Sequence, residues 1–191
     1  MTAQPLRYGM VGGGYGSFIG NAQRWAAAVD GKAALVAGCF SSDEARNREF
    51  ASKFVLADDR IYDDYAEMAR AEAARDDGID FVCIVTPNRL HFDTYRTFLE
   101  AGIHVFAEKP LTFTVDEARQ LEALAQERGL YMAVNYTYTG YAMVKFARDL
   151  VRRGEIGDII NINAEYLQDW LLGELGASDT AERLMSIWRT D

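Results

Sequence analysis

The sequence has few of the residues that build metal sites and disulfides. Its 191 residues include two cysteines and two histidines, which lie scattered along the chain at Cys39, Cys83, His91 and His104. Metal-binding cysteines and histidines usually recur at short, fixed spacings, and these four positions do not. Both cysteines lie in apolar runs, so we expect inert core thiols and no metal site.

The sequence also lacks a basic face and a long apolar run. The formal net charge is -9, whereas nucleic-acid binding requires clustered lysine and arginine. No stretch approaches the roughly 20 apolar residues that span a bilayer, and residues 1–5 do not resemble a secretory leader. We therefore expect a cytoplasmic protein without a nucleic-acid or membrane partner. Because 49% of the residues are hydrophobic, a folded core is expected.

Strand-like and helix-like segments alternate over residues 1–135. Strands are predicted at residues 6–11, 34–40, near Ile61, 81–85, 103–107 and 130–135. Helices are predicted at residues 18–29, 43–54, 63–75, between Asn88 and Gly102, and at 114–129, where Thr114 and Glu117 form a capping-box signature. Repeated strand–helix–strand units predict right-handed crossovers and an α/β fold with a doubly wound parallel sheet.

The pattern changes after residue 135. A helix is predicted at residues 141–153, and residues 158–166 alternate between apolar and polar side chains. A half-polar strand of this kind is typical of a mixed or antiparallel sheet. We therefore predict two domains, residues 1–135 and residues 136–191, the second being the start of another α/β domain with an open sheet. Unpaired strand edges there favour homo-oligomerisation.

A glycine-rich turn follows the first predicted strand. We expect Gly12 to allow a tight bend and Gly14 to let main-chain amides approach a dinucleotide pyrophosphate, with Tyr15 and Gly16 beside it. Ser17 stands where the third glycine of G-x-G-x-x-G is usual and is small enough for close helix packing. The alternative is a glycine-rich turn without a ligand.

The end of the second predicted strand indicates the cofactor preference. An NAD site usually has an acidic residue there, which binds the ribose hydroxyls. Here the strand is followed by Ser41 and Ser42, with Asp43 two residues late and Arg46 one turn into the helix. Hydroxyls beside a guanidinium favour a ribose phosphate, so the pattern leans towards NADP over NAD. The alternative is that Arg46 is a solvated helix residue.

Two later strands end in polar segments. One is Thr86-Pro87-Asn88, with His91 following one turn into the helix, and the other is Glu108-Lys109-Pro110. In an open parallel sheet the ligand crevice lies along the carboxyl ends of the strands, so we expect both segments to contact the cofactor. A partly desolvated lysine near a nicotinamide can act as acid or base. The alternatives are a surface Glu108–Lys109 ion pair and a purely structural His91.

These segments together resemble the Gfo/Idh/MocA family of oxidoreductases. The resemblance spans residues 6–170 and rests on Gly9–Gly14, on Thr86–Asn88 with His91, and on Ala101–Val105 running into Glu108-Lys109-Pro110. It implies a Rossmann domain followed by an α/β domain with a large open sheet. It also implies hydride transfer between NAD(P) and a hydroxyl of a sugar, cyclitol or related polyol, with proton movement assisted by Lys109, and a cis peptide bond between Lys109 and Pro110.

The sequence departs from the family in the second domain. Relatives carry a further motif there with aspartate and histidine, whereas this chain has no histidine after His104. It is therefore expected to be either a fragment or a short form, for which cofactor binding is better supported than turnover. Two other functions stay open: a dinucleotide-binding sensor without chemistry, and a structural oligomerisation partner. Retention of Lys109 favours the enzyme, and the sequence does not identify its sugar.

Overall fold

The computed structural model describes residues 4–167. The chain divides into two units, Met1–Asn135 and Tyr136–Asp191. The first unit contains, in chain order, β1 (Leu6–Gly12), α1 (Phe18–Ala28), β2 (Ala33–Cys39), α2 (Glu44–Ala51), η1 (Asp58–Arg60), α3 (Tyr65–Ala73), β3 (Phe81–Val85), η2 (Asn88–Leu90), α4 (His91–Glu100), β4 (His104–Ala107), α5 (Val115–Arg128) and β5 (Met132–Val134).

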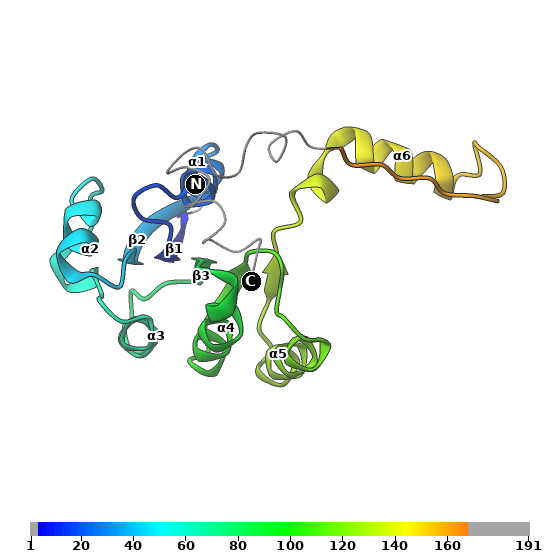
Figure 1. The fold of residues 1–191 in the computed structure, drawn as a ribbon. Coiled ribbons are helices and arrows are strands. Elements are labelled where there is room, and N and C mark those ends of the chain that lie inside the picture. The colour runs from blue at the N-terminus through cyan, green and yellow to red at the C-terminus, as the bar shows by residue number, and fades with distance from the viewer. Residues whose placement is uncertain (1–3, 168–191) are drawn as a thin grey trace, which may run out of the picture. The chain divides into compact units, whose positions relative to one another are not determined.

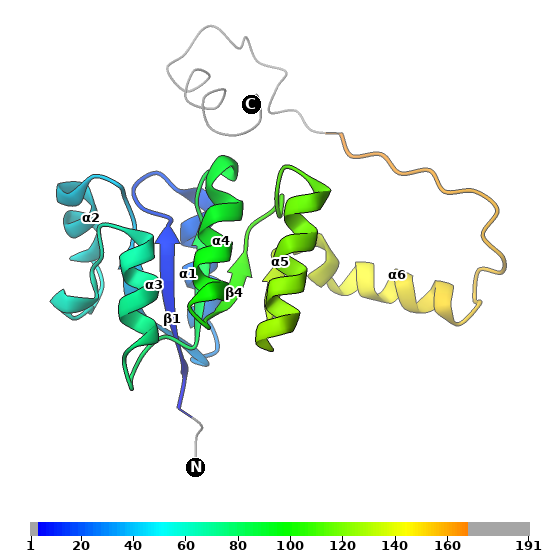
Figure 2. The same cartoon turned by 90° about the horizontal axis from the view of Figure 1, so that it is seen from below.

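The five strands form one parallel sheet in the order β2-β1-β3-β4-β5. The chain pairs β2 with one side of β1 and then crosses over to place β3 on the other side. Helices α3, α4 and α5 lie side by side on one face of this sheet, and α1 covers the other (Figures 1 and 2). This arrangement confirms the doubly wound parallel fold, and the strand order reverses at β1, where such folds bind ligands.

The apolar runs of the sequence form the two layers of the core. β3 is buried from Val82 to Val85 because helices cover both of its faces. On the side of α3, α4 and α5, the largest buried side chains include Tyr95, Phe98 and Leu99, each 0% exposed. The other layer contains Met10 of β1 and aromatic residues around α2. These layers hold the carboxyl ends of the strands in fixed positions.

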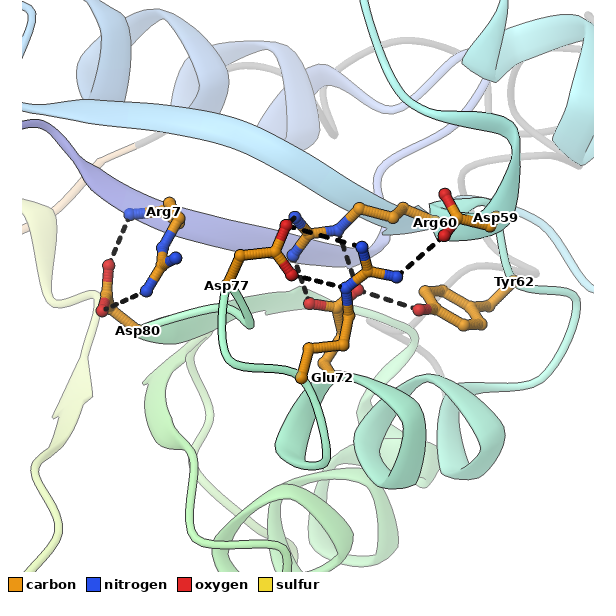
Figure 3. A network of polar contacts seen from close by, with 8 residues as sticks. Arg7, Asp59, Arg60, Tyr62, Glu72, Asp77 and Asp80 are labelled. Carbon is orange, nitrogen blue, oxygen red and sulfur yellow. Dashed lines mark hydrogen bonds and ion pairs between the residues drawn. The ribbon is translucent and has the colours of Figure 1, made fainter.

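A buried ion pair fixes α3 to the segment before it (Figure 3). Arg60 and Glu72 are 6% and 2% exposed, and the Arg60 guanidinium contacts both carboxylate oxygens, with Nε 3.0 Å from Oε1. The Tyr62 hydroxyl donates a further hydrogen bond of 2.8 Å to Glu72. Both charges are desolvated, so removal of Arg60 would leave Glu72 buried without a cation, and removal of Glu72 would leave Arg60 with only the exposed Asp77 carboxylate, 3.6 Å from Nη1.

Element ends and one short strand differ from the sequence prediction. The strand predicted near Ile61 is wrong, because Ile61 makes only a single bridge to Gly38. Helix α2 starts at Glu44 and not at Asp43, because Asp43 is its N-cap. The predicted capping box of Thr114 and Glu117 is present at α5. The existence of the long elements therefore follows from periodicity, while their ends depend on caps.

The second unit contains η3 (Thr137–Gly140) and the predicted helix, α6 (Ala142–Arg152). The strand predicted at residues 158–166 is wrong: this segment has no regular secondary structure and pairs with no strand of residues 4–167. Its apolar side chains are exposed, with Ile160 at 98%. Alternation alone does not form a strand, because the main chain needs a neighbouring strand to bond to. The rest of the predicted second domain, residues 168–191, lies outside the described residues.

Candidate cofactor site

The glycine-rich turn between β1 and α1 has a conformation that side chains disfavour. Gly12, Gly13 and Gly16 have φ angles of 78°, 75° and 76°, in the left-handed region where a Cβ is strained. The turn ends at Ser17, whose side chain accepts a hydrogen bond of 3.1 Å from the Gly20 N–H and so caps α1. The N-terminus of an 11-residue helix therefore opens directly after the turn.

Two other glycines allow this turn to pack closely. A Cβ on Gly14 would lie 2.6 Å from the main-chain oxygen of Phe40, and a Cβ on Gly20 would lie 2.5 Å from the Cα of Gly13. Gly14 therefore lets the turn approach the end of β2, and Gly20 lets α1 approach the turn. The close helix packing expected of Ser17 is made one turn later, at Gly20, which sequence reasoning missed.

A hollow of about 300 Å³ lies at the turn. We call it the turn hollow, and its lining residues are Gly12, Gly13, Gly14, Tyr15, Ser17, Phe40, Ser41, Arg46, Phe50, Val85 and Pro87. The structure thus brings together residues from the ends of β1, β2 and β3 and from α2. Of the predicted site residues, Gly12, Gly14, Tyr15, Ser41, Arg46 and Pro87 line this hollow, whereas Gly16, Ser42, Thr86, Asn88, His91, Glu108, Lys109 and Pro110 lie outside it.

Of the charged residues after β2, Arg46 can contact a ligand in the turn hollow and Asp43 caps a helix. The Asp43 carboxylate accepts a hydrogen bond of 2.8 Å from the Arg46 N–H, and the Asp43 N–H donates one of 3.1 Å to the Ser41 hydroxyl. Asp43 is thus engaged in capping α2 and does not line the turn hollow. The Arg46 side chain lines it and forms no ion pair with the described residues. The acidic residue nearest the expected NAD-binding position therefore stabilises a helix end.

A buried arginine lies behind the turn. Arg24 of α1 is 8% exposed, and its Nη1 donates hydrogen bonds of 2.8 Å to the Gly13 carbonyl and 3.0 Å to the Met10 sulfur. The rings of Phe50 and Phe54 lie 5.1 and 5.3 Å from the guanidinium carbon. Burial lowers the pKa of Arg24, yet a guanidinium keeps its proton. No carboxylate in the described part of the chain pairs with it, so it places positive charge behind the turn.

The Glu108-Lys109-Pro110 segment, called the lysine loop below, is anchored by Glu108. This side chain is 6% exposed, and its carboxylate accepts hydrogen bonds from Gln23 Nε2 at 2.7 Å and Asn135 Nδ2 at 2.6 Å. Glu108 is thus a buried link from α1 to the ends of β4 and β5. Lys109 is exposed at the same edge of the sheet. The Lys109–Pro110 peptide bond is cis, which confirms that expectation.

His91 lies in the interior and binds main-chain groups. It is 1% exposed, and its Nδ1 lies 2.7 Å from the Pro110 carbonyl oxygen and its Nε2 3.0 Å from that of Thr86. Its side chain therefore connects two segments of the site and presents no surface to a ligand. The Thr86 hydroxyl is buried and has no hydrogen-bond partner among the described residues.

Comparisons with known proteins indicate the family of the chain. The chain is 37% identical to the uncharacterized oxidoreductase YfiI of Bacillus subtilis, over 100% of this chain and 48% of that protein. It is 41% identical over 88 residues to a dTDP-3,4-didehydro-2,6-dideoxy-alpha-D-glucose 3-reductase of Streptomyces violaceoruber, over 46% of this chain and 26% of that protein.

A solved structure is similar as well. An inositol dehydrogenase homolog from Azotobacter vinelandii, complexed with NADH and myo-inositol, matches with a TM-score of 0.79 and 44% identity, over 82% of this chain and 41% of that one. The chain thus spans about half the length, or less, of these relatives. Residues 6–136 match the GFO_IDH_MocA model, described as an oxidoreductase family with an NAD-binding Rossmann fold. This chain therefore belongs to the Gfo/Idh/MocA oxidoreductase family.

Proposed function

We propose that the protein is an NAD(P)-dependent oxidoreductase that transfers hydride between a nicotinamide and a carbon that bears a hydroxyl or carbonyl in a sugar, cyclitol or related polyol. The observation that carries this proposal is the turn hollow at the carboxyl ends of β1 and β3, with Lys109 at the same edge of the sheet. The relative with bound NADH and myo-inositol supports both the cofactor and the substrate class.

The residues of the turn hollow fit a dinucleotide. The N-terminus of α1 and the amides of the turn would hold the pyrophosphate, because both present partial positive charge. A Cβ on Gly16 would meet nothing within 4 Å, so the turn is open on that side. Arg24 adds charge from behind. When bound, the nicotinamide supplies or accepts the hydride, and the protein contributes position and proton transfer.

Lys109 is the residue that we propose for proton transfer. Its Nζ would take a proton from a substrate hydroxyl as that group is oxidised, and return one when a carbonyl is reduced. Glu108 holds the loop by accepting a buried hydrogen bond from Gln23 and a partly buried one from Asn135. The loop must hold Lys109 in place, because a general acid or base acts within hydrogen-bond reach of the reacting group or through one water molecule.

For the cofactor, we propose a preference for NADP over NAD. Ser41 and Arg46 line the turn hollow, and a hydroxyl beside a cation suits a ribose phosphate. Asp43, the acidic residue nearest the end of β2, is occupied as the α2 cap. Both features reduce the advantage that NAD would gain from a free carboxylate.

The two units have separate roles in this proposal. Residues 1–135 bind NAD(P), and residues 136–191 contribute to the substrate side and to homo-oligomerisation. Exposed apolar side chains of α6, among them Met143 at 72% and Phe146 at 49%, support the second role. A cytoplasmic location is part of the proposal and fits two free thiols. Among the described residues no helix is long and apolar enough to cross a membrane.

Isotope-traced hydride exchange with a panel of sugars and polyols tests the function. We expect the 191-residue chain to bind NAD(P)H but to exchange hydride far more slowly than the roughly 1–10³ per second of an ordinary dehydrogenase. Lys109→Met should abolish the residual exchange. The control Lys32→Met should not, because Lys32 is an exposed lysine that pairs with Asp30.

The alternative function is a dinucleotide-binding sensor. Cofactor binding without exchange on any substrate, in a chain extended to the length of its relatives, would favour this sensor. Exchange that Lys109→Met leaves unchanged would remove the role of Lys109. Failure of both NADH and NADPH to bind would exclude the enzyme and the sensor together.

A further inference from the structure

We propose that His91 is a positioning residue, held as an imidazolium, which clamps the lysine loop to the end of β3. The proposal begins from the two acceptors around the ring. Nδ1 faces the Pro110 carbonyl at 2.7 Å and Nε2 faces the Thr86 carbonyl at 3.0 Å. Both distances are those of ordinary hydrogen bonds.

Carbonyl oxygens accept hydrogen bonds and cannot donate them. A neutral imidazole donates from one nitrogen only, and its other nitrogen is an acceptor. In the neutral ring, therefore, one of the two contacts would set a nitrogen lone pair against a carbonyl oxygen. The doubly protonated ring satisfies both contacts, because both of its nitrogens are donors. Since His91 is 1% exposed, water cannot replace either partner at low cost.

Helix α4 holds the lysine loop on both sides of Lys109. One turn after His91, the Tyr95 hydroxyl donates to the Glu108 carbonyl and accepts from the Glu108 N–H, both at 3.1 Å. His91 and Tyr95 thus contact the main chain of the residues directly after and directly before Lys109. The ring centroids of His91 and Tyr95 lie 5.0 Å apart, so each ring helps to fix the other.

The titratable groups beside His91 are Glu108 and Lys109 of the lysine loop and Tyr95 of α4. Asp93 of α4 pairs with Arg96, and Cys83 of β3 packs in the other core layer. Within the described residues, no carboxylate lies at ion-pair distance from the His91 ring, and its positive charge is met by the two carbonyl dipoles. Loss of one ring proton would release either Pro110 or Thr86, and with it the fixed position of the lysine loop. The consequence for proton transfer by Lys109 rests on the proposed function.

The protonation state of His91 can be observed directly by ¹⁵N NMR of histidine side chains. The chain has two histidines, and the second is an internal control. His104 Nδ1 accepts a hydrogen bond of 3.1 Å from the Tyr131 N–H, so His104 is expected in the neutral form with its proton on Nε2. At neutral pH the spectrum should show one neutral ring and one ring that carries two protons. The variant His104→Gln should remove the neutral set and leave the doubly protonated one.

Two neutral rings, or a doubly protonated set that disappears with His104→Gln, would overturn the proposal. If the variant does not fold, the spectrum of the unsubstituted chain still shows whether a doubly protonated ring is present. The variant His91→Asn tests the clamp a second time. It should shift the main-chain NMR signals of residues 86 and 108–111 and leave those of Gly12–Gly14 unchanged. A loop that keeps its signals in this variant is not clamped by His91. Neither measurement needs a cofactor, so failure of the proposed function would be seen separately, as absent NAD(P)H binding.

Discussion

Replacement of Arg46 by alanine should weaken NADPH binding and leave NADH binding almost unchanged. Arg46 lies in the first turn of α2, is exposed, and lines the turn hollow beside Ser41. It forms no ion pair with the described residues, so its truncation removes a positive charge without breaking an internal contact. The two cofactors differ by one ribose phosphate, and the variant therefore isolates the interaction with that group.

The size of the effect follows from the exposure of the side chain. Two unit charges about 4 Å apart attract by about 1 kcal/mol in bulk water and by about 4 kcal/mol in the weaker screening near a protein surface. Because Arg46 is exposed, a value near the lower end applies, and we expect a loss of about 1–2 kcal/mol. This corresponds to roughly a 5-fold to 30-fold increase in the Kd of NADPH.

The assay is a fluorescence titration of the purified chain with NADPH and NADH at low and high salt. Arg48→Ala is the matched control, because Arg48 lies on the same helix, pairs with Glu44 and Asp63, and does not line the turn hollow. The loss in Arg46→Ala should shrink at high salt, where exposed charges are screened. An equal NADPH-to-NADH affinity ratio in the two variants would refute the reasoning.

Three further predictions concern stability, each measured by urea denaturation. Glu72→Ala should lower the free energy of unfolding by about 3 kcal/mol, the lower end of the roughly 3–5 kcal/mol for breaking a buried ion pair, because Arg60 stays buried and keeps only a longer contact of 3.6 Å with the exposed carboxylate of Asp77; a loss below about 1 kcal/mol would contradict this. Burial raises the pKa of the Cys83 thiol from 9.0 to about 12. The unfolded chain therefore ionises first, and stability should fall from about pH 9 to pH 12, by up to about 1.4 kcal/mol per pH unit for this thiol. Cys83→Ala should flatten that slope, and an unchanged slope would exclude the thiol as its cause. Gly20→Ala should lower the free energy of unfolding by about 1–3 kcal/mol, because the added methyl group overpacks the contact between α1 and the turn. Gly140→Ala should lower it far less, because a Cβ there meets nothing within 4 Å. Equal losses in the two variants would show that the close approach at Gly20 is not needed.

Much of the fold and of the site could be predicted because it depends on local patterns. The run from Phe81 to Val85 is apolar throughout, as a strand covered on both faces must be. The parallel topology then requires the turn after β1 and the residues after β2 and β3 to share one edge. For this reason Gly12, Ser41 and Pro87, far apart in sequence, could be assigned to one site and are found together around the turn hollow.

The features that could not be predicted depend on contacts across the fold. Gly14 approaches the Phe40 carbonyl, and the spacing of glycines within the turn does not reveal that neighbour. Arg24 lies in an ordinary helical pattern, and its position behind the turn depends on how α1 packs against the Gly13 carbonyl. A basic residue on the inward face of a helix that follows a glycine turn is the signal that could have found it.

The segment at residues 158–166 shows the limit of periodicity. Its alternation satisfies the pattern of a half-buried strand, but the pattern states only which side chains would share a face. Whether the main chain finds a partner depends on the neighbouring strands, and none of residues 4–167 supplies one. Strand formation is a property of a pair, so one segment cannot specify it.

The central claim is that the turn hollow binds NAD(P), and chemical-shift mapping tests it most directly. A ¹H–¹⁵N titration of the labelled chain with NADPH should give saturable shifts in the amides of Gly12–Tyr15, Ser17, Ser41 and Arg46, which line the turn hollow. The amides of α5, which contributes no residue to this hollow, should stay in place. Absence of saturable shifts, or shifts confined to residues away from the turn, would contradict the account.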